Sequence, residues 1–177
     1  MKTDIVKRVS HPLVLALFGD RYVAATAARA LRELGVDRAD LSIVARTHDD
    51  EGVLARDVGG TPGVEIEDSR LGWLLGELSG HILAAIAIVM PGIGPIVTAG
   101  PLAADLGEAV GHATGSLSST LEKAGLSKAQ ASAWQTRIEQ GMVLLGVHAQ
   151  PDQSLRVRQA LEQAGADEVA MATWTGD

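Results

Sequence analysis

The chain has 177 residues, of which 46% are hydrophobic and 21% are charged, a composition typical of a folded domain rather than a disordered chain. It contains no cysteine, which excludes disulfides, zinc fingers and thiolate catalysis. The net charge of −7 and the aromatic content of 3% argue against a nucleic-acid-binding surface. The first 12 residues are polar and do not lead into the apolar core of a signal peptide, so we expect a cytoplasmic rather than a secreted protein.

Residues 12–47 have the pattern of a strand, a helix and a second strand. Leu13–Phe18 is an unbroken apolar run, which is typical of a buried strand. Asp20 is suited to begin a helix, and Gly35 is suited to end it. Leu41–Arg46 predicts the second strand of this unit.

The C-terminal part of the chain, residues 141–175, repeats this pattern at a shift of 130 residues. The Ala-Leu pair, the glycine and the aspartate that end the first helix recur as Ala160, Leu161, Gly165 and Asp167. Two strand–helix–strand units usually pair into one antiparallel sheet with both helices on one face. We therefore expect a single α+β domain over residues 1–177 with a ferredoxin-like split βαβ sheet.

The segment between the two units differs from both of them. Residues 48–70 are acidic and glycine-rich, which indicates a linker, and the 27 residues from Leu78 to Ala104 contain no Asp, Glu, Lys or Arg. Prolines and glycines interrupt this uncharged stretch, so we expect an inserted helical hairpin and a short helix within residues 71–140. The predicted turn of the hairpin contains Pro91, Gly92, Gly94, Pro95, Gly100 and Pro101.

Glycines recur at every fourth position on both predicted arms of the hairpin. A spacing of four places each row on one helix face, where small residues let two backbones approach closely. The predicted packing ridge consists of Gly72, Gly76, Gly80, Gly107, Gly111 and Gly115. After the hairpin, Ser127 is suited to cap a short helix that ends at Gly141.

Two pieces of the middle segment carry a resemblance to a known family. They are Ile88-Val-Met-Pro-Gly-Ile-Gly-Pro95 and Ala99-Gly-Pro-Leu-Ala103, and they lie between the two strand–helix–strand units. This order resembles the bacterial general-stress-protein 17M-like family, which carries the heat-induced stress protein domain. The resemblance covers roughly residues 12–175 and implies a stress context. It implies no established enzymatic activity, cofactor or catalytic residue.

Four polar residues stand out on the predicted hairpin: Glu77, His81, Glu108 and His112. Each glutamate precedes a histidine by four residues, so the two share a helix face, and the antiparallel hairpin would bring both pairs to one level. One interpretation is two hydrogen-bonded Glu–His pairs or a solvent-facing stripe. A second is a site for Zn, Fe or Mn, although helix-bundle sites usually space Glu and His by three. A third is a pH-responsive role of the histidines.

Three functional hypotheses follow. The first is a non-enzymatic stress-associated protein that forms homodimers or larger homo-oligomers through the apolar hairpin. The second is a membrane-associated or membrane-inserted hairpin, against which the charged residues of the second predicted arm argue. The third is a metal-binding protein that uses the four Glu and His residues. No nucleophile, cofactor loop or acid–base pair outside these four favours an enzyme.

Overall fold

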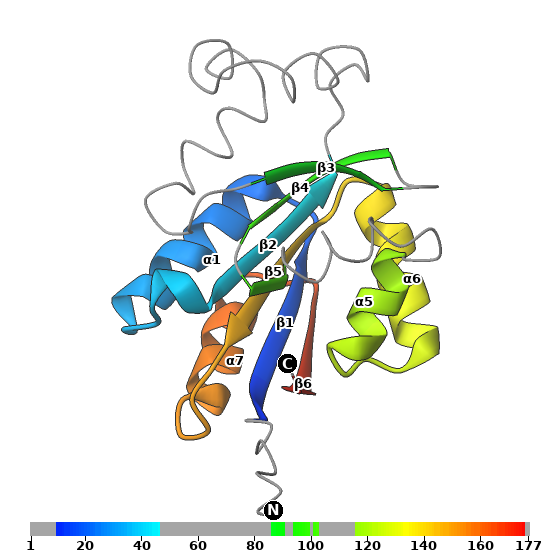
Figure 1. Ribbon diagram of the computed structural model, residues 1–177. Helices are drawn as coiled ribbons and strands as arrows, with labels where there is room; N and C mark the ends of the chain where they lie inside the picture. The colour runs from blue at the N-terminus through cyan, green and yellow to red at the C-terminus, as the bar shows by residue number, and fades with distance from the viewer. Residues whose placement is uncertain (1–9, 47–85, 91–93, 100, 103–115, 176–177) are drawn as a thin grey trace, which may run out of the picture.

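The computed structural model describes residues 10–46, 86–90, 94–99, 101–102 and 116–175. Within these ranges, six strands form one antiparallel sheet in the order β3-β4-β2-β5-β1-β6. Helices cover both faces of this sheet, α1 and α7 on one side and α5 and α6 on the other (Figure 1). The predicted α+β class is confirmed.

The first unit consists of β1 (His11–Phe18), α1 (Arg21–Glu33) and β2 (Leu41–Arg46), with a short 3-10 helix, η1 (Arg38–Asp40), before β2. The Asp20 side chain caps α1 by accepting hydrogen bonds from the first-turn backbone, the shorter at 2.6 Å. The capping prediction is therefore confirmed.

The second unit consists of β5 (Val143–His148), α7 (Ser154–Gln163) and β6 (Glu168–Trp174). Its helix is followed by Gly165 at φ +95°, as α1 is followed by Gly35 at φ +88°. The repeated glycines therefore end both helices in the left-handed conformation that glycine adopts most readily. β1 lies between β5 and β6 and pairs antiparallel with each, so the two units interleave in the sheet.

One face of the sheet packs against α1 and α7. Alternate residues of β1 point to this face because side chains alternate along a strand. Together with residues of β2, β5 and both helices they form a first core. Its buried strand residues are Val14, Ala16, Phe18, Leu41, Ile43, Ala45, Val143, Leu145 and Val147.

The opposite face packs against α5 (Leu117–Lys123), α6 (Lys128–Glu139) and the side chain of Leu102. The intervening residues of β1 point to this second core, in which Trp134 is the largest fully buried side chain. β1 is thus buried on both faces, which accounts for its unbroken apolar sequence. The predicted short helix is confirmed as α6, with Ser127 accepting a hydrogen bond from the backbone of Gln130.

The predicted helical hairpin is wrong at its centre. Ile86–Met90 forms β3 and Gly94–Ala99 forms β4, so a β-hairpin stands where we expected the end of one helix and the turn. Gly94 and Pro95 lie in β4, which pairs with β2 and so extends the sheet. The β-branched isoleucines and valines of this segment favour strands, and proline disfavours a helix interior.

Of the second predicted arm, the structure describes only Pro101 and Leu102, which are helical. After it, Ser116 is extended, and its side chain caps α5 by accepting a hydrogen bond from the backbone of Ser119. The glycine ridge, the turn residues Pro91, Gly92 and Gly100, and the linker at residues 48–70 lie outside the described residues.

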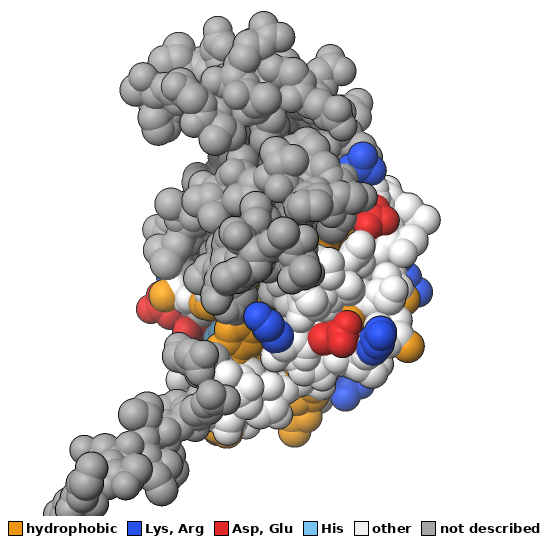
Figure 2. Space-filling view, turned by 45° about the vertical axis from the view of Figure 1, so that its right-hand side comes forward, with side chains coloured by type: hydrophobic (Ala, Val, Ile, Leu, Met, Phe, Trp, Pro, Cys, Tyr) orange, Lys and Arg blue, Asp and Glu red, His pale blue; other side chains and the backbone are white. Residues whose placement is uncertain are grey.

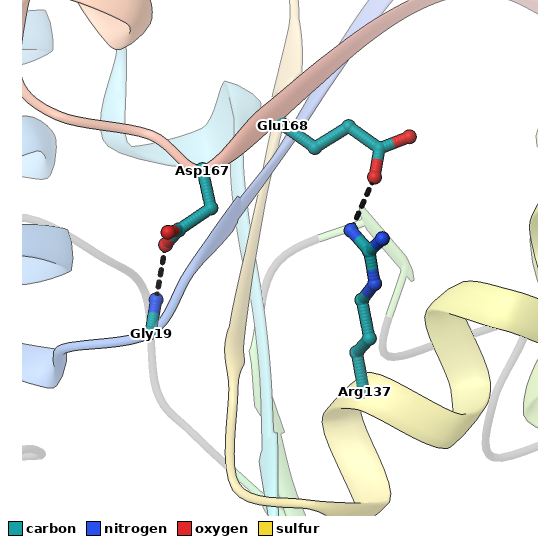
Figure 3. A network of polar contacts seen from close by, with 4 residues as sticks. All are labelled: Gly19, Arg137, Asp167 and Glu168. Carbon is teal, nitrogen blue, oxygen red and sulfur yellow. Dashed lines mark hydrogen bonds and ion pairs between the residues drawn. The ribbon is translucent and has the colours of Figure 1, made fainter.

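The aspartate of the second unit joins the ends of β1 and β6 (Figure 3). Asp167 accepts a hydrogen bond from the backbone of Gly19 at 2.6 Å, and its own N–H donates to the carbonyl of Leu17 at 2.9 Å. Beside it, Glu168 forms an ion pair with Arg137 of α6, which links β6 to the second helical layer.

We expect Asp167→Ala to lower the free energy of unfolding by about 1–2 kcal/mol, because it removes a charge-assisted hydrogen bond between two strands. The matched control is Asp37→Ala at the equivalent position of the first unit. Among the described residues, the Asp37 carboxylate accepts only from the backbone of Ala39 within its own turn, at 3.1 Å, so a loss of about 0.5 kcal/mol or less is expected. Urea unfolding of both variants measures the difference, and equal losses would contradict it.

Candidate functional site

The four Glu and His residues predicted as a site, Glu77, His81, Glu108 and His112, lie outside the described residues. Within the described ranges, no group of three His, Asp or Glu side chains is arranged to hold a metal ion. In the same ranges, no helix has the length and apolar character needed to cross a bilayer. The metal and membrane hypotheses therefore remain predictions.

The first candidate site is the outer edge of β3. This strand ends the sheet, and among the described strands only β4 pairs with it. Its sequence, Ile-Ala-Ile-Val-Met, contains no charged residue and no proline. Proteins usually protect an edge strand with charges, prolines or bulges, because its unpaired backbone groups can bind another strand. β3 has neither the charges nor the proline.

The opposite edge of the sheet, β6, is different. It begins with Glu168, whose carboxylate is paired with Arg137, and it exposes Met171 and Thr173. The turn between α5 and α6 also approaches this strand, since a Cβ added at Gly125 would lie 2.9 Å from Ala172. On the face shown in Figure 2, acidic and basic side chains of the described residues are interspersed.

The second candidate site is a pair of histidines at the end of the sheet where β1 begins and β5 ends. The strand register places His11 opposite Trp174, and His148 opposite Leu13. The Nε2 atom of His11 lies 2.8 Å from the Nδ1 atom of His148, which is a hydrogen bond. The indole of Trp174 packs edge-on against the His148 ring, with 5.0 Å between the ring centroids. These two contacts therefore connect the ends of three neighbouring strands, β5, β1 and β6.

His148 is 7% exposed, and its Nε2 atom has no hydrogen-bond partner among the described residues. Burial, and secondly the neighbouring His11, lower the pKa of His148 from 6.5 to about 4. The imidazole is therefore neutral at physiological pH. Near the pair, burial and Asp37 raise the pKa of Asp40, while His11 lowers it.

A cavity of about 380 Å³ opens beside His11. Its lining includes three hydroxyl side chains, those of Ser10, Ser154 and Thr173. His11 therefore has one neighbour that is buried and one side that water can reach. This arrangement suits the uptake and release of a proton better than nucleophilic chemistry, since the described residues hold no nucleophile within hydrogen-bond reach of either ring.

Neither histidine belongs to the sites predicted from the sequence. The signal that could have found them is the topology itself. In a sheet that interleaves two strand–helix–strand units, the start of β1 lies beside the end of β5, and each of these positions carries a histidine. The exact contact depends on the register, which the sequence pattern does not specify.

Comparison of the chain with models of protein families, with curated proteins and with solved structures finds no match in any of the three. The class of protein is therefore defined by its own architecture, an antiparallel α+β sheet covered by helices on both faces.

Proposed function

We propose that this chain is a non-enzymatic interaction protein that self-associates by pairing the β3 edge of one copy with the β3 edge of a second. The observation that carries the proposal is the outer edge of β3, an uncharged, proline-free strand at the end of the sheet, which has no strand partner on that side among the described residues. The self-association hypothesis is thereby retained with a β-hairpin in place of the predicted helices.

A second copy of the chain is the partner best suited to this edge. Two identical strands that pair antiparallel are related by a twofold axis, which is the commonest symmetry of homo-oligomers. Such pairing gives the outer backbone groups of β3 partners in both copies at once and joins two sheets into one. In a chain with a net charge of −7, an uncharged segment is also where two copies repel each other least.

The overall plan of the two outer units is part of the proposal. We infer that β6, β1, β5 and β2 follow the ferredoxin-like arrangement, with β3 and β4 added at the β2 edge. The strand order and the packing of α1 and α7 on one face support this inference. The bacterial stress context rests on the resemblance of the Pro-Gly-Ile-Gly-Pro and Ala-Gly-Pro-Leu-Ala segments alone.

The test is to place two lysines on the β3 edge, in the variant Ala87→Lys/Val89→Lys. Sedimentation of the wild-type chain is expected to show a concentration-dependent dimer or larger oligomer. In the variant, like charges on paired strands oppose each other, and we expect dimerisation to weaken about tenfold or more. Circular dichroism verifies that the variant is folded.

The matched control carries two lysines on the other edge strand, at the exposed positions Met171 and Thr173 of β6. We expect Met171→Lys/Thr173→Lys to sediment as the wild type does. A wild-type chain that is monomeric at all concentrations would refute self-association. An oligomer that only the β6 lysines dissociate would show that the interface is the other edge of the sheet.

A further inference from the structure

We propose that the histidine pair, His11 and His148, is a proton-operated switch that holds the ends of β1, β5 and β6 together and releases them on acidification. The proposal concerns the opposite part of the sheet from the β3 edge and does not depend on self-association. It rests on the hydrogen bond between the rings, on the burial of His148 and on the open cavity beside His11.

The geometry makes the pair sensitive to protons. One proton lies between the Nε2 atom of His11 and the Nδ1 atom of His148, whichever ring carries it, and their separation is 2.8 Å. If both rings are fully protonated, two N–H groups point at each other and no acceptor remains between them. The hydrogen bond is then replaced by repulsion between two adjacent cations.

Full protonation also leaves a buried charge without compensation. The Nε2 atom of His148 has no partner among the described residues, so a cationic His148 would bury an unpaired N–H. The groups around the pair are the Trp174 indole on β6, the Ser154 hydroxyl at the start of α7, and the Asp40 carboxylate before β2. Asp40 interacts electrostatically with His11, and Asp37 interacts with Asp40.

A protonated His11 ring can move into the cavity beside it. The ring lines a cavity of about 380 Å³ that is open to water, so an imidazolium can leave His148 and be hydrated there. Among the described residues, the His148 ring has no such space, because it is buried and Trp174 packs against it. Acidification therefore separates the rings by displacing His11, which begins β1.

The direction of the pH effect follows from the two states. In the closed state the two rings are hydrogen-bonded, and in the released state they are apart. The pKa of His148 is about 4 in the closed state and about 6.5 in the released state, so the released state binds more protons between these pH values. The closed state is thus fully favoured above pH 6.5 and loses its advantage as the pH falls toward 4. From pH 7.5 to pH 5, the balance shifts toward release roughly 30-fold.

Amide hydrogen exchange of the full chain tests the proposal. The reporter is the N–H of Ala149, which follows His148 and donates to the Pro12 carbonyl at 2.9 Å. After correction for the intrinsic exchange rate, we expect its protection to fall roughly 30-fold from pH 7.5 to pH 5. The amide of Leu145, at the centre of β5, is expected to keep its protection over the same range.

The control variant is His148→Asn, whose side-chain amide can still bond to His11 but does not titrate. Its Ala149 protection is expected to change by less than about threefold between the two pH values. If His148→Asn does not fold, His148→Gln serves the same purpose, because its amide does not titrate either. Equal pH dependence in the wild type and the variant, or a His148 ring that titrates near pH 6.5 by NMR, would overturn the proposal.

Discussion

Replacing Trp134 with alanine is expected to lower the free energy of unfolding by about 3–5 kcal/mol. The side chain is 0% exposed and is the largest in the core between α5, α6 and the sheet. Its removal leaves a cavity in the core that holds three leucines of β1 and the leucines of α5, Leu117 and Leu121. Urea unfolding followed by circular dichroism measures the loss.

Trp134→Phe is the matched control. The indole Nε1 atom has no hydrogen-bond partner among the described residues, so phenylalanine loses volume but no hydrogen bond. We expect a loss of roughly 1–2 kcal/mol, clearly smaller than that of alanine. Losses below 1 kcal/mol in both variants would mean that α5 and α6 do not pack on the sheet, which would contradict the second core.

Replacing Gly125 with alanine is expected to cost about 2–4 kcal/mol. This glycine lies between α5 and α6 at φ +105°, where an L-residue is strained. The added Cβ would also lie 2.9 Å from the Cβ of Ala172 and 3.3 Å from the backbone of Thr173, both on β6. The backbone cannot yield as the end of a flexible side chain would, so the turn must move away from the strand.

Gly35→Ala separates these two effects. Gly35 has a similar φ of +88°, but a Cβ there would meet nothing within 4 Å. Its expected cost is about 1 kcal/mol, from backbone strain alone. The difference between the two variants in thermal or urea unfolding reports the close approach of the α5–α6 turn to β6. Equal costs would show that this approach does not limit stability.

The outer units could be predicted from the sequence because local signals agreed with the fold. Apolar runs indicated β1 and β2, Asp20 began α1, and the repeated glycines ended both helices. These signals depend on short-range chemistry, such as capping and side-chain alternation. Asp167 shows the limit, because its bond to Gly19 depends on how two distant segments meet.

Residues 86–99 were predicted incorrectly because two signals conflicted. Glycines at every fourth position suggested helices, whereas the isoleucines and valines of residues 86–97 favour strands. Pairing of β4 with β2 decided between them, and such tertiary pairing leaves no local trace in the sequence. The histidine pair was missed for the same reason, since its members are 137 residues apart.

The most direct test of the central claim, the pairing of two β3 edges, uses the absence of cysteine from the chain. Single cysteines are placed in turn at residues 86–90, and each variant is oxidised at low concentration. Paired strands bring opposite residues to a Cα–Cα distance of about 4.5–5.5 Å, which a disulfide can span. We predict a covalent dimer at the one or two positions nearest the twofold axis and none for Thr173→Cys on β6. Absence of a covalent dimer throughout the β3 series, with crosslinking of Thr173→Cys instead, would contradict the account.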